Sequence, residues 1–385
     1  IRLRIKSANE NIRSVNQLSS FIEKEYVEFY HALESPEGSK KGDHTEMMND
    51  ANDYDFYNDN AILKPHLDRC YGWDYESYKA GTYVGENFGC GTDDYKEMVE
   101  CLRSVDANKL VKLQESFYKW DIEPIIIFAP VVEVNTKDAF LTAHPSKILR
   151  SGKYPSIPWM TGVNSEEGCV RAAGIYKDQK LIDDLDQDFS KIMALTLSNE
   201  NPKFEKIAKR IRQFYFGNKK IDNTTLHNAI NLYSDIMFVP ATDTAVKLHF
   251  KYSKQPVYYY LFSHKTEHSF GEIIGMPNLN YGTCHADELL LQFPLNILFK
   301  DPLDNLDTYY SKLFIKLWSN FAKTGNPTPE RNNVISTLWK PGRTKNLEYY
   351  HIGGGVHTAS NLYPERIKFW RELNKSEKIN IRDEL

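Results

Sequence analysis

The sequence lacks a long apolar run, an excess of basic charge and a dense set of cysteines. No stretch of about 18 apolar residues occurs in the 385-residue chain, so it offers no candidate for a membrane-spanning helix. The net charge is −4 and the pI is about 6.3, which argues against a nucleic-acid-binding protein. With 41% hydrophobic and 26% charged residues, the composition is that of a globular protein able to bury a large core.

The five cysteines are too few for a disulfide scaffold and, without a Cys-x-x-Cys pair, too scattered for a zinc cluster. The sequence therefore indicates no metal and no cofactor. Cys90 and Cys101 flank a short segment that contains Gly, Thr and Asp, so they could close one small loop. They could equally be two unrelated thiols, and the spacing leaves both interpretations open. The spacing predicts no partner for Cys70, Cys169 or Cys284.

The two ends of the sequence bear on its localisation. The basic start, Arg2–Lys6, is not followed by an apolar core, so we expect no signal peptide in this chain, and it could be a processed protein or a fragment. Residues 382–385 read Arg-Asp-Glu-Leu, one conservative step from the retention signal of the endoplasmic reticulum. Sequons at Asn223 and Asn374 permit glycosylation in the secretory pathway. We therefore predict a secretory protein, resident in the lumen of the endoplasmic reticulum, with a charged tail as the alternative.

A change in composition near residue 84 divides the chain. Residues 1–83 are left without a fold assignment, although 15–33 has the apolar spacing of an amphipathic helix. Within this region, residues 43–59 carry six acidic residues and no Lys or Arg, and Asn and Tyr are frequent. This acidic segment predicts a long loop or disorder. We assign residues 84–375 to one domain and 376–385 to a tail.

Strand-like and helix-like patterns alternate in the 84–375 domain, which predicts a layered α/β sheet. Strands are expected where short runs are apolar, β-branched or aromatic, at 125–134, 156–163 and 256–263. Helices are expected where apolar residues recur at helical spacing, at 93–102, 106–114, 181–216 with a break near Pro202, 226–238, 241–252, 304–324 and 364–373.

Two loops that follow predicted strands carry reactive side chains. One contains Glu166 and Glu167, after the strand that ends at Val163, and the other contains Cys284 and His285, downstream of the strand 256–263. Sites in α/β sheets form at the carboxyl ends of strands. A carboxylate there could orient an imidazole, whose second nitrogen would act as a general base. A hydrogen-bonded loop histidine and a solvated loop acid are the structural alternatives.

A series of short motifs runs in order from about residue 87 to residue 374. They comprise Phe88–Cys90, Glu100–Arg103, Phe128–Glu133, Phe140–Leu141, His144–Pro145, Pro158–Met160, Gly162, Ser165–Gly168, Tyr233–Asp235, Phe238, Pro256–Tyr260, Gly282, His285–Glu288, Trp318, Phe321, Gly325–Pro327, Trp339–Pro341 and Phe369–Trp370. Together they resemble the C-terminal half to two-thirds of a type-B carboxylesterase, in the cholinesterase-like branch of the α/β-hydrolases. The closest likeness is to insect carboxylesterases.

This resemblance implies a partial α/β-hydrolase fold, namely the C-terminal portion of the central sheet with its flanking helices. It implies that Glu167, which directly precedes Gly168, is the acid of a catalytic triad and that His285 is its base. It also implies a Cys90–Cys101 disulfide. The substrate of an active member would be a small-molecule ester, and neither a cofactor nor a particular oligomeric state is implied.

The family's nucleophile is missing from the sequence. Its elbow, Gly-x-Ser-x-Gly, should precede the acid, but no two glycines four residues apart enclose a central Ser, and Gly38–Gly42 has Lys40 there. The only Gly-rich string after a His, residues 351–355, follows His285 and predicts a turn between late elements. We therefore expect a truncated or inactive carboxylesterase. The alternative is a non-catalytic, esterase-like binding or adhesion protein.

Overall fold

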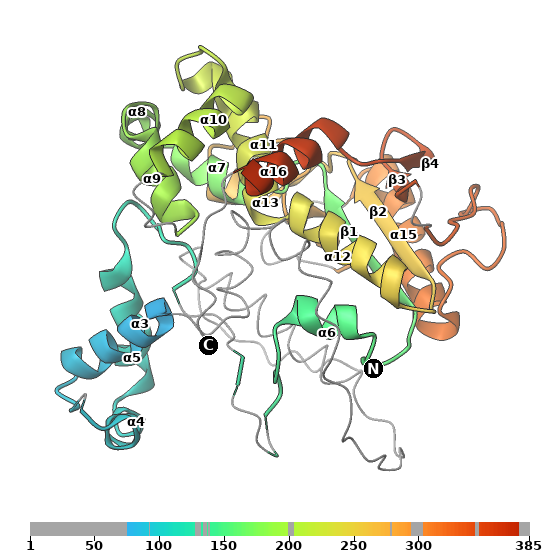
Figure 1. Ribbon diagram of the computed structural model, residues 1–385. Coiled ribbons are helices and arrows are strands. Elements are labelled where there is room, and N and C mark those ends of the chain that lie inside the picture. Colours follow the sequence, from blue (N-terminus) through green and yellow to red (C-terminus); the bar gives the residue numbers. More distant parts are fainter. Residues whose placement is uncertain are drawn as a thin grey trace. The chain divides into compact units, whose positions relative to one another are not determined.

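The computed structural model describes residues 75–91, 93–127, 132–133, 137, 139–198, 204–277, 279–293, 303–342 and 346–376 (Figure 1). The chain divides into two units, Ile1–Asp53 and Tyr54–Leu385, and all of these residues belong to the second. The predicted helix at 15–33, the acidic segment at 43–59, Cys70 and the tail from residue 377 lie outside the described residues.

A run of short helices precedes the sheet. Asp94 and Asp106 each accept hydrogen bonds from the first backbone N–H groups of a helix, which explains where two of these helices begin. The Cys90–Cys101 disulfide joins the segment after the first helix to the second. The elements are α3 (Tyr75–Asn87), α4 (Tyr95–Arg103), α5 (Ala107–Lys112), η2 (Leu113–Phe117) and α6 (Pro145–Ser151).

The described sheet has four strands in the order β1-β2-β3-β4: β1 (Trp159–Asn164), β2 (Val257–Phe262), β3 (Glu348–Ile352) and β4 (Val356–Ser360) (Figure 1). The first three strands are parallel, and β4 is antiparallel to β3. The predictions for β1 and β2 are confirmed. The β3–β4 hairpin was not predicted, although the expected turn between late elements is present as Gly353–Gly355, all three with positive φ.

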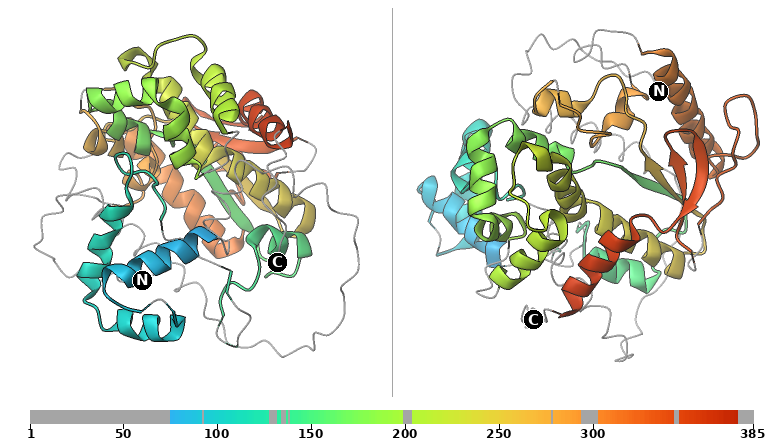
Figure 2. Two further views of the ribbon diagram at one scale, coloured as in Figure 1. Left: turned by 60° about the vertical axis from the view of Figure 1, so that its left-hand side comes forward. Right: turned by 90° about the horizontal axis from the view of Figure 1, so that it is seen from above.

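Helices connect the three parallel strands and cover both faces of the sheet (Figure 2). Every residue of β2 is buried, and alternate side chains point to opposite faces. Tyr258 and Phe262 pack with Leu313 of α15, whereas Tyr259 and Leu261 lie in the cluster that contains Val246 of α12. The helices are α7 (Cys169–Tyr176), α8 (Gln179–Gln187), α9 (Phe189–Thr196), α10 (Phe204–Phe216), η3 (Asn223–Thr225), α11 (Leu226–Met237), α12 (Val239–Tyr252), α13 (Phe270–Ile274), α14 (Asp287–Leu290), α15 (Asn305–Thr324) and α16 (Pro364–Ser376).

The prediction of a strand at 125–134 is wrong for its described part, because residues 125–127 and 132–133 belong to no strand. An apolar run forms a strand only where a neighbour supplies backbone hydrogen bonds. The chain just before it turns back on itself instead, with Trp120 and Glu123 forming an isolated bridge. The Glu123 carboxylate is fully buried and accepts a hydrogen bond from Arg171 Nε at 3.1 Å, while Arg171 Nη1 donates to Asp121 at 2.8 Å. A buried ion pair therefore anchors this segment to α7.

Helix α16 joins the core through a second buried charge. Arg366 donates to Asp235 of α11, with Nε to Oδ2 at 2.7 Å and Nη2 to Oδ1 at 2.5 Å. The hydroxyl of Tyr215 donates to the same carboxylate, and Trp370 Nε1 donates to that hydroxyl at 2.7 Å. Burial raises the pKa of Asp235, while the hydrogen bonds and charge of Arg366 oppose the rise. The network thus ties α10, α11 and α16 together.

Candidate active site

The acid loop, Ser165–Gly168, connects the end of β1 to the start of α7. Glu167 is buried, and its Oε1 accepts a hydrogen bond from Asn164 N at 2.8 Å. Gly168 lies directly against α11, where a Cβ would stand 2.2 Å from the carbonyl oxygen of Ile230. Its N–H donates to Ser234 Oγ at 2.8 Å. The glycine after Glu167 is therefore required by close backbone contact, and this contact fixes the position of the carboxylate.

The histidine loop, Gly282–Ala286, leads into α14. Gly282 has φ +76° and packs against Glu166, so a side chain at this position would be strained and obstructed. Thr283 N donates to Glu166 Oε2 at 2.8 Å, and Ala286 has φ +69°. Glu166 and Cys284 form an isolated parallel bridge. The loop thus lies beside the acid loop and has a tightly turned backbone.

The structure brings Glu167 and His285 together. His285 Nδ1 is 2.6 Å from Glu167 Oε2, and the imidazole stacks on Phe238 at a centroid distance of 4.6 Å. Burial lowers the pKa of His285, but the charge and hydrogen bond of Glu167 outweigh it, and the net pKa is raised. Because the carboxylate accepts from Nδ1–H, the second nitrogen, Nε2, is the one available as a base. The side chain of His285 is 43% exposed, whereas that of Glu167 is 8% exposed.

Two further carboxylates lie next to this pair. Asn164 Nδ2 donates to Glu288 Oε2 at 2.5 Å and to the carbonyl of Cys284 at 2.7 Å. Burial and the nearby charge of Glu167 raise the pKa of Glu288. Burial also raises the pKa of Asp287, to about 7, although three hydrogen bonds oppose the rise. When they are ionised, these two acids favour the protonated form of His285.

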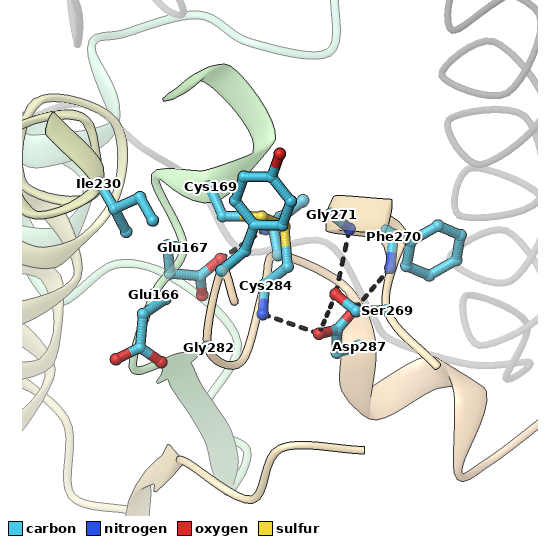
Figure 3. The surroundings of a disulfide bond; sticks show 12 residues. Glu166, Glu167, Cys169, Ile230, Ser269, Phe270, Gly271, Gly282, Cys284 and Asp287 are labelled. Carbon is cyan, nitrogen blue, oxygen red and sulfur yellow. Dashed lines mark hydrogen bonds and ion pairs between the residues drawn. A yellow bond between two sulfur atoms is a disulfide. The ribbon is translucent and has the colours of Figure 1, made fainter. Parts of the chain in front are cut away.

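A second disulfide, Cys169–Cys284, joins the first residue of α7, directly after the acid loop, to the histidine loop (Figure 3). The sequence does not predict this bond, since nothing in the spacing selects this pair among the cysteines. The only signal was position, because each cysteine lies within two residues of a proposed triad residue. With two disulfides, the chain is consistent with a protein of the secretory pathway.

The two sequons differ in accessibility. Asn223 is exposed, whereas Asn374 is buried on α16, so the predicted glycan at Asn374 does not fit the structure. A glycan at Asn223 stays a prediction.

The described residues contain no group of His, Cys, Asp or Glu that could hold a metal ion. None of their helices combines the length and the hydropathy that a membrane-spanning helix needs.

The carboxylate of Glu167 and the imidazole of His285 lie on loops downstream of two neighbouring parallel strands, an arrangement similar to that of the α/β-hydrolase class. The family model described as "Carboxylesterase family" matches residues 71–370, beginning somewhat before the expected start near 87, and the chain belongs to this family. The likeness to insect carboxylesterases is also confirmed. Juvenile hormone esterase of Tribolium castaneum is 29% identical over 71% of this chain and 51% of its own length. Venom carboxylesterase-6 of Apis mellifera is 30% identical over 63% of this chain and 44% of its own length.

Among solved structures, this chain is similar to juvenile hormone esterase from Manduca sexta, with OTFP covalently attached. The TM-score is 0.60 at 21% identity, and the match covers 77% of this chain and 56% of that one. This likeness confirms the α/β-hydrolase fold. The chain spans about half the length of the curated relatives that it matches.

Proposed function

We propose that this chain carries the acid and the base of a carboxylesterase triad, with Glu167 orienting the imidazole and His285 acting as general base. The observation that supports this most directly is the 2.6 Å contact between His285 Nδ1 and Glu167 Oε2. In such a triad the base removes a proton from a serine hydroxyl, which attacks the ester carbonyl. The base then gives this proton to the alcohol oxygen, the ester C–O bond breaks, the alcohol leaves and an acyl-enzyme remains. The base then activates water, and the acyl-enzyme is hydrolysed. The substrate would be a small carboxylic ester.

We propose further that the 385 residues do not by themselves hydrolyse esters. No Gly-x-Ser-x-Gly occurs in the sequence, so no nucleophile elbow is available to His285. Among the residues that the structure describes, none forms a hydrogen bond with His285 Nε2. An acid–base pair alone activates water only weakly, since neither an acyl-enzyme nor an oxyanion site contributes.

Two measurements on the purified chain test these proposals. NMR titration of His285, assigned with His285→Ala, should give a pKa above the ordinary value of 6.5, and Glu167→Gln should lower it. Exposure to a fluorophosphonate should leave the intact mass unchanged. An adduct that disappears in His285→Ala would reveal a working nucleophile and refute inactivity. A titration that Glu167→Gln leaves unaltered would instead favour the alternative, a partner-binding protein that has no need of the pair.

For localisation, we propose retention in the lumen of the endoplasmic reticulum through residues 382–385, Arg-Asp-Glu-Leu. The two disulfides support a secretory route. In insect cells that express the chain behind a signal peptide, deletion of these four residues should move the protein into the medium. Equal retention with and without them would contradict the proposal.

A further inference from the structure

The two halves of the proposed acid–base pair are positioned by the sheet to very different degrees. Glu167 follows the last residue of β1, Asn164, within one turn, and Asn164 N also donates to its carboxylate. His285 is separated from the end of β2, Phe262, by α13 and two loops. The parallel register of β1 and β2 therefore places the acid but leaves the position of the base to other contacts.

The residue just before the base makes three of those contacts. Cys284 is completely buried, and its N–H donates to Asp287 Oδ2 at 2.8 Å. Its carbonyl accepts from Asn164 Nδ2 at 2.7 Å. Its sulfur is bonded to Cys169 (Figure 3). Of these three links, the first stays within the segment of the base, whereas the second and third cross to the acid's side of the site, and only the disulfide is covalent.

The disulfide is anchored on a rigid element. Cys169 is the first residue of α7, directly after Gly168, and it is fully buried. It packs against α13, where a Cβ on Gly271 would lie 2.9 Å from its sulfur. Asp287 accepts hydrogen bonds from Ser269 Oγ and Phe270 N, at the start of α13. The residues that follow His285 are therefore also held to α13 (Figure 3).

We propose that the Cys169–Cys284 disulfide is a positioning clamp, which holds His285 against Glu167 in the absence of a nucleophile or a substrate. This inference rests on the proposed function of that pair. Since neither sulfur-bearing residue is exposed, the bond is shielded from reductants in the folded protein and acts as a permanent link. Cys169 and Cys284 are thus positioning residues, which act through the orientation of the imidazole.

The Cys90–Cys101 disulfide provides a matched control, because it is a bond of the same kind between the segment that follows α3 and helix α4, and neither cysteine flanks a proposed site residue. We would compare Cys169→Ala/Cys284→Ala with Cys90→Ala/Cys101→Ala by NMR of the full chain. Two signals report orientation: the pKa of His285 and the low-field resonance of its Nδ1 proton. The first double variant should lose that resonance and shift the pKa down toward 6.5, whereas the control should retain both.

The outcomes separate the clamp from the proposed function. If Cys169→Ala/Cys284→Ala keeps the resonance and the raised pKa, while Glu167→Gln loses them, the clamp is refuted and the acid–base pair stands. If Glu167→Gln changes neither signal, the proposed function itself fails. Cys169→Val/Cys284→Ala restores buried volume should the first variant not fold. Failure of both variants to fold, with the control folded, would overturn a positioning role in favour of a structural one.

Discussion

Replacement of Arg171 by Leu should destabilise the protein by about 3–5 kcal/mol, because it leaves a buried carboxylate without its cation. The side chain of Arg171 is 2% exposed and that of Glu123 is 0% exposed, so water cannot replace the lost partner. The guanidinium also lies over the ring of Trp120, at 5.2 Å from its centroid. For a domain of about 290 residues, with an unfolding entropy of about 2.1 cal/mol/K per residue, such a loss corresponds to a decrease in Tm of roughly 5–8 °C.

Because the Glu123 carboxylate is left unpaired, the destabilisation caused by Arg171→Leu should depend on pH. Burial already raises the pKa of Glu123, and Arg171 opposes the rise. In Arg171→Leu the folded-state pKa of Glu123 should rise further, well above its unfolded value. The folded state then binds more protons than the unfolded state, so the destabilisation should shrink as the pH falls from 7 to 5. Urea unfolding followed by circular dichroism at both pH values measures this.

An exposed arginine supplies the control. Arg103 pairs with Glu100 at 2.6 Å, but the two side chains are 70% and 60% exposed, so Arg103→Leu should change stability by less than about 1 kcal/mol. Adding Glu123→Gln to Arg171→Leu removes the unpaired charge and should recover at least half of the loss. The stabilising role of the buried Arg171–Glu123 pair is refuted if Arg171→Leu lowers the free energy of unfolding no more than Arg103→Leu does. It is also refuted if the added Glu123→Gln restores none of that free energy.

Three further predictions concern the site and the surface. Gly168→Ala should cost at least about 2 kcal/mol in urea unfolding, because its Cβ would stand 2.2 Å from the carbonyl oxygen of Ile230; a neutral result would show that α11 can move aside. Asp287 has a folded pKa of about 7, above its unfolded value, so its favourable contribution is fully present only in acid and is lost as the pH rises through 7. Asp287→Asn should flatten that part of the stability profile, and an unchanged slope would contradict the assignment. Asn223→Gln should remove the one glycan detected by mass spectrometry in insect cells, whereas Asn374→Gln should remove none.

The sequence was informative where side chains alone decide the structure. The β2 strand is predictable because an aromatic, β-branched run of this length fits a strand buried on both faces. Residues 125–127 are three isoleucines, which also favour a strand, but they form none, because strand formation also requires a neighbour that composition does not reveal. The β4 strand was missed because its five side chains are exposed or only partly buried and provide little apolar signal.

In the candidate site, too, the sequence predicts individual residues but not the contacts between distant segments. Glu167 and His285 were proposed from their resemblance to family motifs, and the contact between them, like the Cys169–Cys284 bond, depends on how loops far apart in the sequence fold together. Those two cysteines are 115 residues apart, and five cysteines allow many pairings. Only the three-dimensional arrangement identifies this pair.

The buried ion pair of Asp235 and Arg366 sets an order of events during synthesis of the chain. The carboxylate lies in α11, and its cation follows 131 residues later in α16. On the ribosome, α7 to α11 can collapse early, but the Asp235 side chain must then stay hydrated or take up a proton until α16 arrives. Helices α7 to α11 can therefore complete their shared core only after α16 has left the exit tunnel. A nascent chain that stalls before this point would leave the buried side of α11 exposed to chaperones.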